Sequence, residues 1–159
     1  MTTRQDLIDG FQMIARQGTR VAEGFGPQDW SYQVHDEEAG WTVKHTYCHL
    51  TASAEVLPGL LGALSQAKEG DNAAAGIDIN AFNAQSVAAR EGMSEPELIQ
   101  AFQTAHEKAI EVVQNLSDEQ LQQRRRFGAI EAPVAELLDT FFILHGISHI
   151  YHTTSRPLN

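Results

Sequence analysis

The sequence predicts an all-α protein, a four-helix bundle with additional short helices. Long segments carry apolar residues at helical spacing, and helix start signals precede most of them. No segment alternates apolar and polar residues strictly over five or more positions, as a half-buried strand would. The length of 159 residues suits one domain over 1–159, and a hydrophobic content of 42% is enough for a sizeable core.

The first predicted helix runs from a cap at Thr2 or Thr3 to about Gly24. Its apolar residues recur every three or four positions: Leu7, Ile8, Phe11, Ile14, Ala15 and Val21. The Gly-Phe-Gly-Pro sequence at 24–27 ends it. We expect the irregular, aromatic stretch at 28–40 to pack over one end of the domain.

The second long helix begins after Thr42, its predicted N-cap, and extends to about Ala67. The third position of this helix is His45, where a capping box would have Glu or Gln. Pro58 should bend the helix or end its first half, because proline removes a backbone donor and clashes with the preceding turn.

Capping signals also define the second half of the chain. Ser94 caps a third long helix and Glu97 closes its capping box, and Pro133 opens the final helix, which extends to about Thr154. The third long helix covers 94–116. The remaining elements are a loop over 68–78, a short helix over 80–90 and a short segment over 117–128.

Composition and charge exclude several classes of protein. The net charge of −10 argues against a nucleic-acid-binding protein. The run of three arginines at 124–126 is short, and we interpret it as a solvated face or the end of a short helix. The single cysteine, Cys48, excludes an intramolecular disulfide. The polar N-terminus and the lack of an apolar run of ~20 residues favour a cytoplasmic protein that does not bind membranes.

Histidines are concentrated in two of the predicted helices. In the last one, His145, His149 and His152 are spaced by four and three residues and therefore share one helix face. The same face continues back through the apolar stretch at 138–142, so we expect it to be buried. Buried imidazoles need polar partners, and a bound metal ion is one way to supply them.

The second helix carries another pair at the same spacing, His45 and His49. Packed helices lie ~8–10 Å apart, so imidazoles on facing stripes can share one ion. Apolar neighbours place His49 near the buried stripe, whereas His45 lies in the first turn, so His49 is the preferred ligand. One histidine from this helix and a pair from the last would leave a coordination position open, as in catalytic metal sites.

Several other polar residues lie near these histidines. His152 and His45 are candidates to support the ligands through hydrogen bonds, and Glu55 or Asp139 could orient an imidazole. Adjacent helix positions point ~100° apart, so Cys48 is predicted to be a core residue rather than a ligand beside His49. Packing roles are predicted for Trp41 and Tyr47, and solvent-facing positions for His35 and His106.

Three motifs together resemble the DinB-like superfamily of proteins. Trp-Thr-Val-Lys at 41–44, followed by His49 and Leu50, resembles its Trp-Ser/Thr-Val-Lys…His-Leu signature. The segment 145–152 resembles its C-terminal His-x-x-x-His helix, and Phe-Asn-Ala-Gln at 82–85 is similar to a segment of the mycothiol-dependent maleylpyruvate isomerase group. The resemblance covers the chain from about residue 3 to residue 154.

The resemblance implies a four-helix bundle that binds a divalent metal through His49, His145 and His149, and it implies a homodimer. The family includes bacterial S-transferases that use low-molecular-weight thiols. Two positions depart from its pattern. The family often has Asp or Glu in place of His45, which leaves this residue open as a spare ligand, a proton carrier or a surface residue. The isomerases often have Glu in place of His145, so histidine here favours the general DinB-like metal site.

The sequence therefore predicts a metal-dependent enzyme, with zinc or nickel as the most expected ion and iron or manganese also compatible. No catalytic side chain is identified, because the reacting group would be water or a thiol at the open position of the ion. The expected reaction is transfer of a small thiol cosubstrate to a small electrophile, or hydrolysis. Two alternatives remain: a non-catalytic metal-binding or stress-response bundle, and an interaction bundle without an ion.

Overall fold

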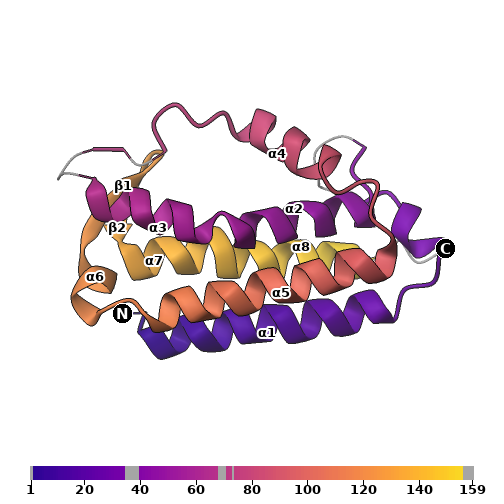
Figure 1. Ribbon diagram of the computed structural model, residues 1–159, viewed down its shortest axis with the longest axis horizontal. Helices are drawn as coiled ribbons and strands as arrows, with labels where there is room; N and C mark the ends of the chain where they lie inside the picture. The colour runs from indigo at the N-terminus through magenta and orange to yellow at the C-terminus, as the bar shows by residue number, and fades with distance from the viewer. Residues whose placement is uncertain (1, 35–39, 68–70, 73, 156–159) are drawn as a thin grey trace.

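Four helical rods lie side by side along the long axis of the protein in a computed structural model, which describes residues 2–34, 40–67, 71, 72 and 74–155 (Figure 1). The predicted four-helix bundle is confirmed. Two rods are single helices, α1 (Arg4–Glu23) and α5 (Glu95–Gln114). The third rod is α2 (Val43–Glu55) followed by α3 (Leu57–Gln66). The fourth rod is α7 (Val134–Leu138), a π-helical segment η2 (Asp139–Leu144) and α8 (His145–Thr154). None of the described helices has the length and apolarity needed to cross a bilayer.

The predicted helix starts are confirmed by their hydrogen bonds. The backbone N–H groups of Thr3 and Ser94 donate to the carboxylates of Asp6 and Glu97 at 2.8 Å, which closes the two capping boxes. The second rod divides at Val56, and Pro58 lies in the first turn of α3, where its missing N–H costs no helix bond.

Shorter elements connect the rods: η1 (Asp29–Ser31), α4 (Ile79–Ala88), α6 (Asp118–Gln122), and the antiparallel strands β1 (Arg124–Phe127) and β2 (Ile130–Pro133). Helix α4 lies outside the bundle against α2 (Figure 1). The arginines at 124–126 form β1, so the expectation of a helix end is wrong, whereas Arg124 and Arg126 are exposed, as expected of a solvated face. A four-residue strand is too short to show alternation in the sequence, and tertiary contacts fix it: Arg125 donates to the carbonyl oxygen of Leu64 at 2.8 Å.

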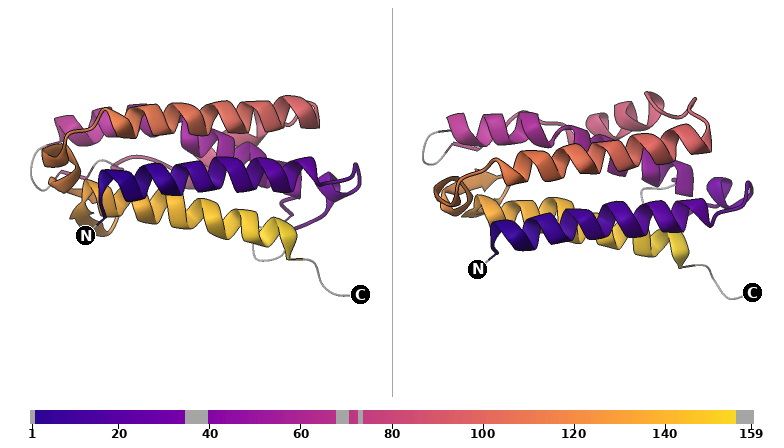
Figure 2. Two further views of the ribbon diagram at one scale, coloured as in Figure 1. Left: turned by 90° about the horizontal axis from the view of Figure 1, so that it is seen from below. Right: turned by 60° about the horizontal axis from the view of Figure 1, so that its bottom comes forward.

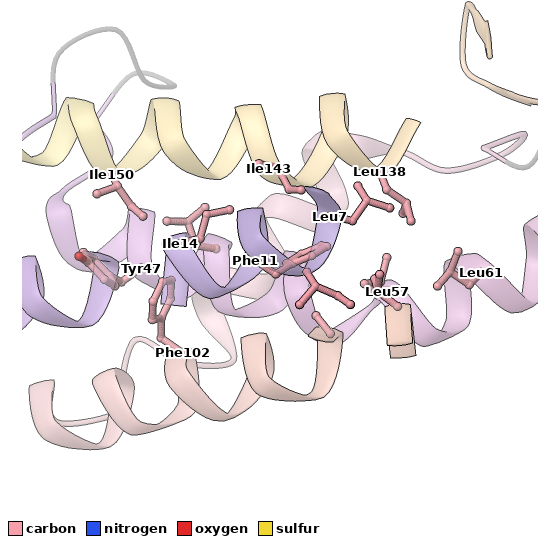
Figure 3. Packing of buried hydrophobic residues seen from close by; sticks show 14 of the residues in the cluster. Leu7, Phe11, Ile14, Tyr47, Leu57, Leu61, Phe102, Leu138, Ile143 and Ile150 are labelled. Carbon is pink, nitrogen blue, oxygen red and sulfur yellow. The ribbon is translucent and has the colours of Figure 1, made fainter. Parts of the chain in front are cut away.

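The core is a continuous apolar cluster between the rods (Figure 3). Tyr47 and Phe102 in this cluster have no exposed surface, and their rings are 5.2 Å apart. The Tyr47 hydroxyl donates to the carbonyl oxygen of Gly18 at 2.7 Å, and burial raises the pKa of this hydroxyl. Tyr47 therefore ties α2 to α1 across the bundle, and its predicted packing role is confirmed.

Glycines let α1 and α8 approach closely. A Cβ atom on Gly10 would lie 2.5 Å from Ile143, and one on Gly146 would lie 2.9 Å from Ile14. A Cβ atom on Gly18 would lie 2.5 Å from the Phe102 ring and 3.2 Å from Ile150. The contacts between α1 and the rod formed by η2 and α8 join residues 132 or 133 positions apart in the sequence, and the two rods run parallel (Figure 2).

His106 is buried, with 3% of its surface exposed, so the prediction that it faces solvent is wrong. Its Nδ1 atom lies 2.8 Å from the Phe102 carbonyl oxygen, and burial lowers its pKa to about 4. Because α5 packs against both α1 and α2, its buried face is wider than the apolar stripe of its sequence indicates. His35, the other histidine predicted to face solvent, lies outside the described residues.

We predict that Gly18→Ala lowers the free energy of unfolding by about 1–3 kcal/mol, although alanine favours helices. The new methyl group would displace the fully buried Phe102 ring. Gly62→Ala is the matched control, because a Cβ atom there meets no atom within 4 Å, and it should stabilise by about 0.5–1 kcal/mol. Urea denaturation measures both values, and equal stabilisation by the two changes would contradict the packing.

Acid should destabilise the fold through His106. Its pKa of about 4 in the folded chain lies below the ordinary value of 6.5, so the unfolded chain binds the extra proton first as the pH falls. This contribution to stability is complete above pH 6.5, and about 3 kcal/mol of it should be lost by pH 4. Urea denaturation of wild type and His106→Leu at several pH values isolates the effect; parallel pH profiles would refute it.

Candidate metal centre

Three imidazoles from two rods converge between α2 and α8. Nε2 of His145 lies 3.3 Å from Nε2 of His49 and 2.7 Å from Nε2 of His149. One ring nitrogen from each of the three residues can be chosen so that all three lie within 4.8 Å of one another. The structure therefore brings together the three histidines that the sequence singled out as candidate ligands.

The rotation of α8 about its axis decides where its histidines point. Its buried residues are Gly146, Ile150 and Thr153, and Ile150 approaches Gly18 of α1. His145 and His149 lie beside this stripe and are half-buried, whereas His49 on α2 is 6% exposed. The prediction that the histidine face itself is the buried stripe of the last helix is therefore wrong.

The π-helical segment η2 lies directly before His145. A π turn accommodates one extra residue, so it rotates the following helix by roughly 100° relative to the preceding one. This rotation lets α7 bury Leu138 in the core and lets α8 direct its imidazoles toward α2. The sequence prediction of an uninterrupted α-helix from Pro133 missed this turn, because a local change in hydrogen bonding leaves no clear signal in residue spacing.

The geometry fits a small divalent ion. Zinc–nitrogen bonds of about 2.0–2.1 Å place tetrahedral ligand atoms about 3.3–3.4 Å apart, close to the separation between His49 and His145. The shorter separation between His145 and His149 widens with a small ring rotation, because the outer torsion of histidine is soft. Imidazole is a preferred ligand of zinc, nickel and iron.

An aromatic ring lies beside His49, the candidate ligand on α2. The ring of Trp41 is 5.2 Å from that of His49, at an angle of 55°, and the side chain is partly exposed. Two backbone hydrogen bonds hold this residue just before α2: Val34 N–H to the Trp41 carbonyl and Val43 N–H to the Tyr32 carbonyl, both 2.9 Å. Trp41 thus forms an apolar wall beside the ligand as well as a packing contact.

His45 has a structural role that the sequence left open. Its Nδ1 accepts a hydrogen bond from the Thr42 N–H at 3.3 Å, and its own N–H donates to the Thr42 hydroxyl. Histidine therefore closes the capping box in place of Glu or Gln. Its Nε2 lies 3.6 Å from a carboxylate oxygen of Glu91. His45 is outside the group of convergent histidines, and it stabilises the first turn of the helix that carries His49.

The other candidate residues lie outside the histidine group. His152 is half-buried, with its ring 5.9 Å from that of Tyr151. In the described chain, Glu55 pairs with Arg90, and Asp139 makes no hydrogen bond to an imidazole, so neither orients one. Cys48 has no exposed surface and burial raises its pKa to about 11, which confirms that it is a core thiol.

A sequence model of the mycothiol maleylpyruvate isomerase N-terminal domain matches residues 11–141. The chain belongs to this family. The match confirms the resemblance to the DinB-like superfamily, and it includes His49 but ends before His145 and His149. No curated protein matches the chain.

A solved structure extends the comparison to the fold of almost the whole chain. YfiT from Bacillus subtilis, described as a probable metal-dependent hydrolase with an unusual four-helix bundle topology, superposes with a TM-score of 0.67. The identity is 15%, and the alignment covers 95% of this chain and 83% of YfiT. At this identity the similarity establishes the four-helix architecture.

The His45 cap gives a direct test of the start of α2. We predict that His45→Ala lowers the free energy of unfolding by about 1 kcal/mol, because the Thr42 N–H loses its partner. His45→Gln should retain most of the stability, since its amide oxygen can accept the same hydrogen bond. Urea denaturation in the presence of EDTA measures both, and equal losses would show that the capping bond is not responsible.

Proposed function

We propose that this protein is a metal-dependent enzyme in which His49, His145 and His149 hold one divalent ion. The convergence of their ring nitrogens within 4.8 Å carries the proposal, because His49 and His145 are 96 residues apart in the chain. Zinc or nickel is the preferred ion, and iron or manganese is compatible with the ligands.

Three neutral ligands would leave the ion with its full positive charge. They would also leave at least one coordination position open to water or a thiol. An ion held in this way supplies Lewis acidity, which lowers the pKa of a bound water molecule or thiol. The chain itself fixes the ligands and shields them. The His45 cap and the backbone pairing around Trp41 fix the start of α2, and the Trp41 ring lies 5.2 Å from the His49 ring.

The comparisons support the two reactions that the sequence predicts. The family is named for a mycothiol-dependent isomerase, which supports activation of a low-molecular-weight thiol and its transfer to a small electrophile. YfiT is described as a probable metal-dependent hydrolase, which supports hydrolysis. No formal negative charge comes from the ligand set, so the site would favour an anionic group such as a thiolate or carboxylate.

The main alternative is a non-catalytic bundle in which the ion has a structural or sensory role. An interaction bundle that binds no ion is a further alternative. Metal binding separates the interaction bundle, which binds no ion, from the enzyme and the non-catalytic metal protein. Turnover then separates the enzyme from the non-catalytic metal protein.

Metal analysis tests the ligand set. We predict about one zinc or nickel ion per wild-type chain after loading and desalting. In His145→Ala and in His149→Ala, the dissociation constant of the metal ion should rise more than about 100-fold. His106→Leu is the control, because it removes a buried histidine on α5. Equal metal content in all four proteins would reject the site.

Turnover tests the enzymatic part of the proposal. The metal-loaded protein is incubated with a panel of small thiols and the electrophile monochlorobimane, whose thiol adduct is fluorescent, and separately with ester and amide substrates. We expect one of the two reactions in wild type and at least a 100-fold lower rate in His49→Ala, because the metal is lost. No turnover with any metal form would favour the non-catalytic alternative.

A further inference from the structure

Trp41 differs from the other tryptophan of the chain in what surrounds its ring. Trp30 is 4% exposed, and its ring lies 5.6 Å from that of Phe25 and 5.3 Å from that of Tyr47 in the apolar core. Trp41 is partly exposed, and among the described residues it belongs neither to the core cluster nor to the half-buried apolar residues packed against it. Its ring lies beside His49 instead. Core packing therefore does not account for an indole at this position.

Hydrogen bonds hold the backbone of Trp41 in place. The Val34 N–H donates to the Trp41 carbonyl oxygen at 2.9 Å, and Gln33 pairs with Thr42 in an isolated antiparallel bridge. Thr42 is also the N-cap of α2. An indole turns about only two side-chain torsions, so on a fixed backbone it loses little conformational freedom when a ligand covers it.

The Trp41 ring lies close enough to the three-histidine group for one small molecule to contact both. The centre of the Trp41 ring is 5.2 Å from that of His49. The His49 ring is in turn 5.1 Å from the rings of His145 and His149. These separations are comparable to the dimensions of a small aromatic molecule.

The helical segments that carry the histidines offer no formal charge beside them. Residues 46–54 and residues 140–155 contain no Asp, Glu, Lys or Arg. Lys44 precedes His49 by five positions, which places it roughly 140° around the helix. The charge of an anionic ligand would therefore be matched by the ion, and the rest of the ligand would meet uncharged groups of these segments.

We propose that Trp41 is a specificity-determining residue of the metal centre, and that its ring binds the flat, uncharged part of the substrate. The substrate would be a small aromatic or conjugated anion, such as an arenethiolate or an aromatic carboxylate, with its anionic group directed to the ion. Aromatic rings prefer offset-stacked or edge-to-face contacts with one another, which favours a flat ring over a saturated one of similar size. The inference rests on the proposed function, because it requires an ion at His49, His145 and His149.

A cationic group is the other kind of ligand that an indole face attracts. An ion held by three neutral imidazoles keeps its positive charge, and it would repel a second cation bound at Trp41. An uncharged ring attached to an anionic group therefore fits this position better than a quaternary ammonium does.

Ligand binding to the zinc-loaded protein tests the role of Trp41. We expect calorimetric titration to give a dissociation constant for benzoate at least about 10-fold below that for acetate, with cyclohexanecarboxylate between them. In Trp41→Leu this preference should fall to about threefold or less, and in Trp41→Phe most of it should remain. Tyr151→Leu is the matched control, because this aromatic residue is 66% exposed on the side of α8 away from the histidines, and the preference should be unchanged.

Fluorescence reports where the ligand binds without requiring a reaction. The chain has two tryptophans, so Trp30→Phe leaves Trp41 as the source of the signal. Its emission should shift to shorter wavelength when benzoate covers the ring, whereas acetate should cause no such shift. EDTA should abolish the shift with benzoate, because the anionic group is no longer held by the ion.

The outcomes distinguish this inference from the proposed function. A protein that binds no ion would overturn both. Three results with a zinc-loaded protein would overturn the role of Trp41 alone. These are equal affinity for benzoate and acetate or for benzoate and cyclohexanecarboxylate, an undiminished preference in Trp41→Leu at unchanged metal content, and tighter binding of benzyltrimethylammonium than of benzoate.

Discussion

The close contact between α1 and α8 is the constraint on which the candidate metal centre depends. Ile143 and Ile150 fit against Gly10 and Gly18, and Ile14 fits against Gly146, with no room for a Cβ atom at any of these glycines. These contacts fix both the height and the rotation of α8. Side chains on a helix point in directions that are fixed relative to one another. Packing Gly146 and Ile150 against α1 therefore directs the neighbouring histidines toward α2. A bulkier residue at these glycines would therefore disturb the site as well as the core.

The opposite wall of the site is fixed by local interactions at the start of α2. His45 caps the helix through Thr42, and backbone hydrogen bonds on both sides of Trp41 hold that residue before the first turn. Tyr47 then ties the same helix to α1 through Gly18. His49 lies two residues after Tyr47, so the contact that ties α2 to α1 also helps to position the His49 ring. Preorganised ligands of this kind lose little conformational freedom when an ion binds.

The two sides of α8 have different chemistry, and helix geometry explains how they coexist. Side chains four residues apart share a face, which places His145 and His149 together toward α2. Leu144, Ile147 and Tyr151 lie on the exposed side, where their apolar surface is not covered by the chain itself. Helix α8 carries no Asp, Glu, Lys or Arg, so it places no competing carboxylate or cation among the imidazoles.

Sequence reasoning determined the features that depend on neighbours along the chain. The cap at Thr2 or Thr3, the capping box at Ser94, the interruption near Pro58 and the two His-x-x-x-His pairs follow from side-chain chemistry within one or two helix turns. They could therefore be recognised without a fold.

Only the tertiary structure decided the rest. The β-hairpin at 124–133, the burial of His106 and the π turn before His145 depend on which surfaces cover each segment. The meeting of His49 with His145 and His149 depends on how α8 is rotated against α1. That rotation is set by contacts between residues more than 100 positions apart, which periodicity within a single helix cannot encode.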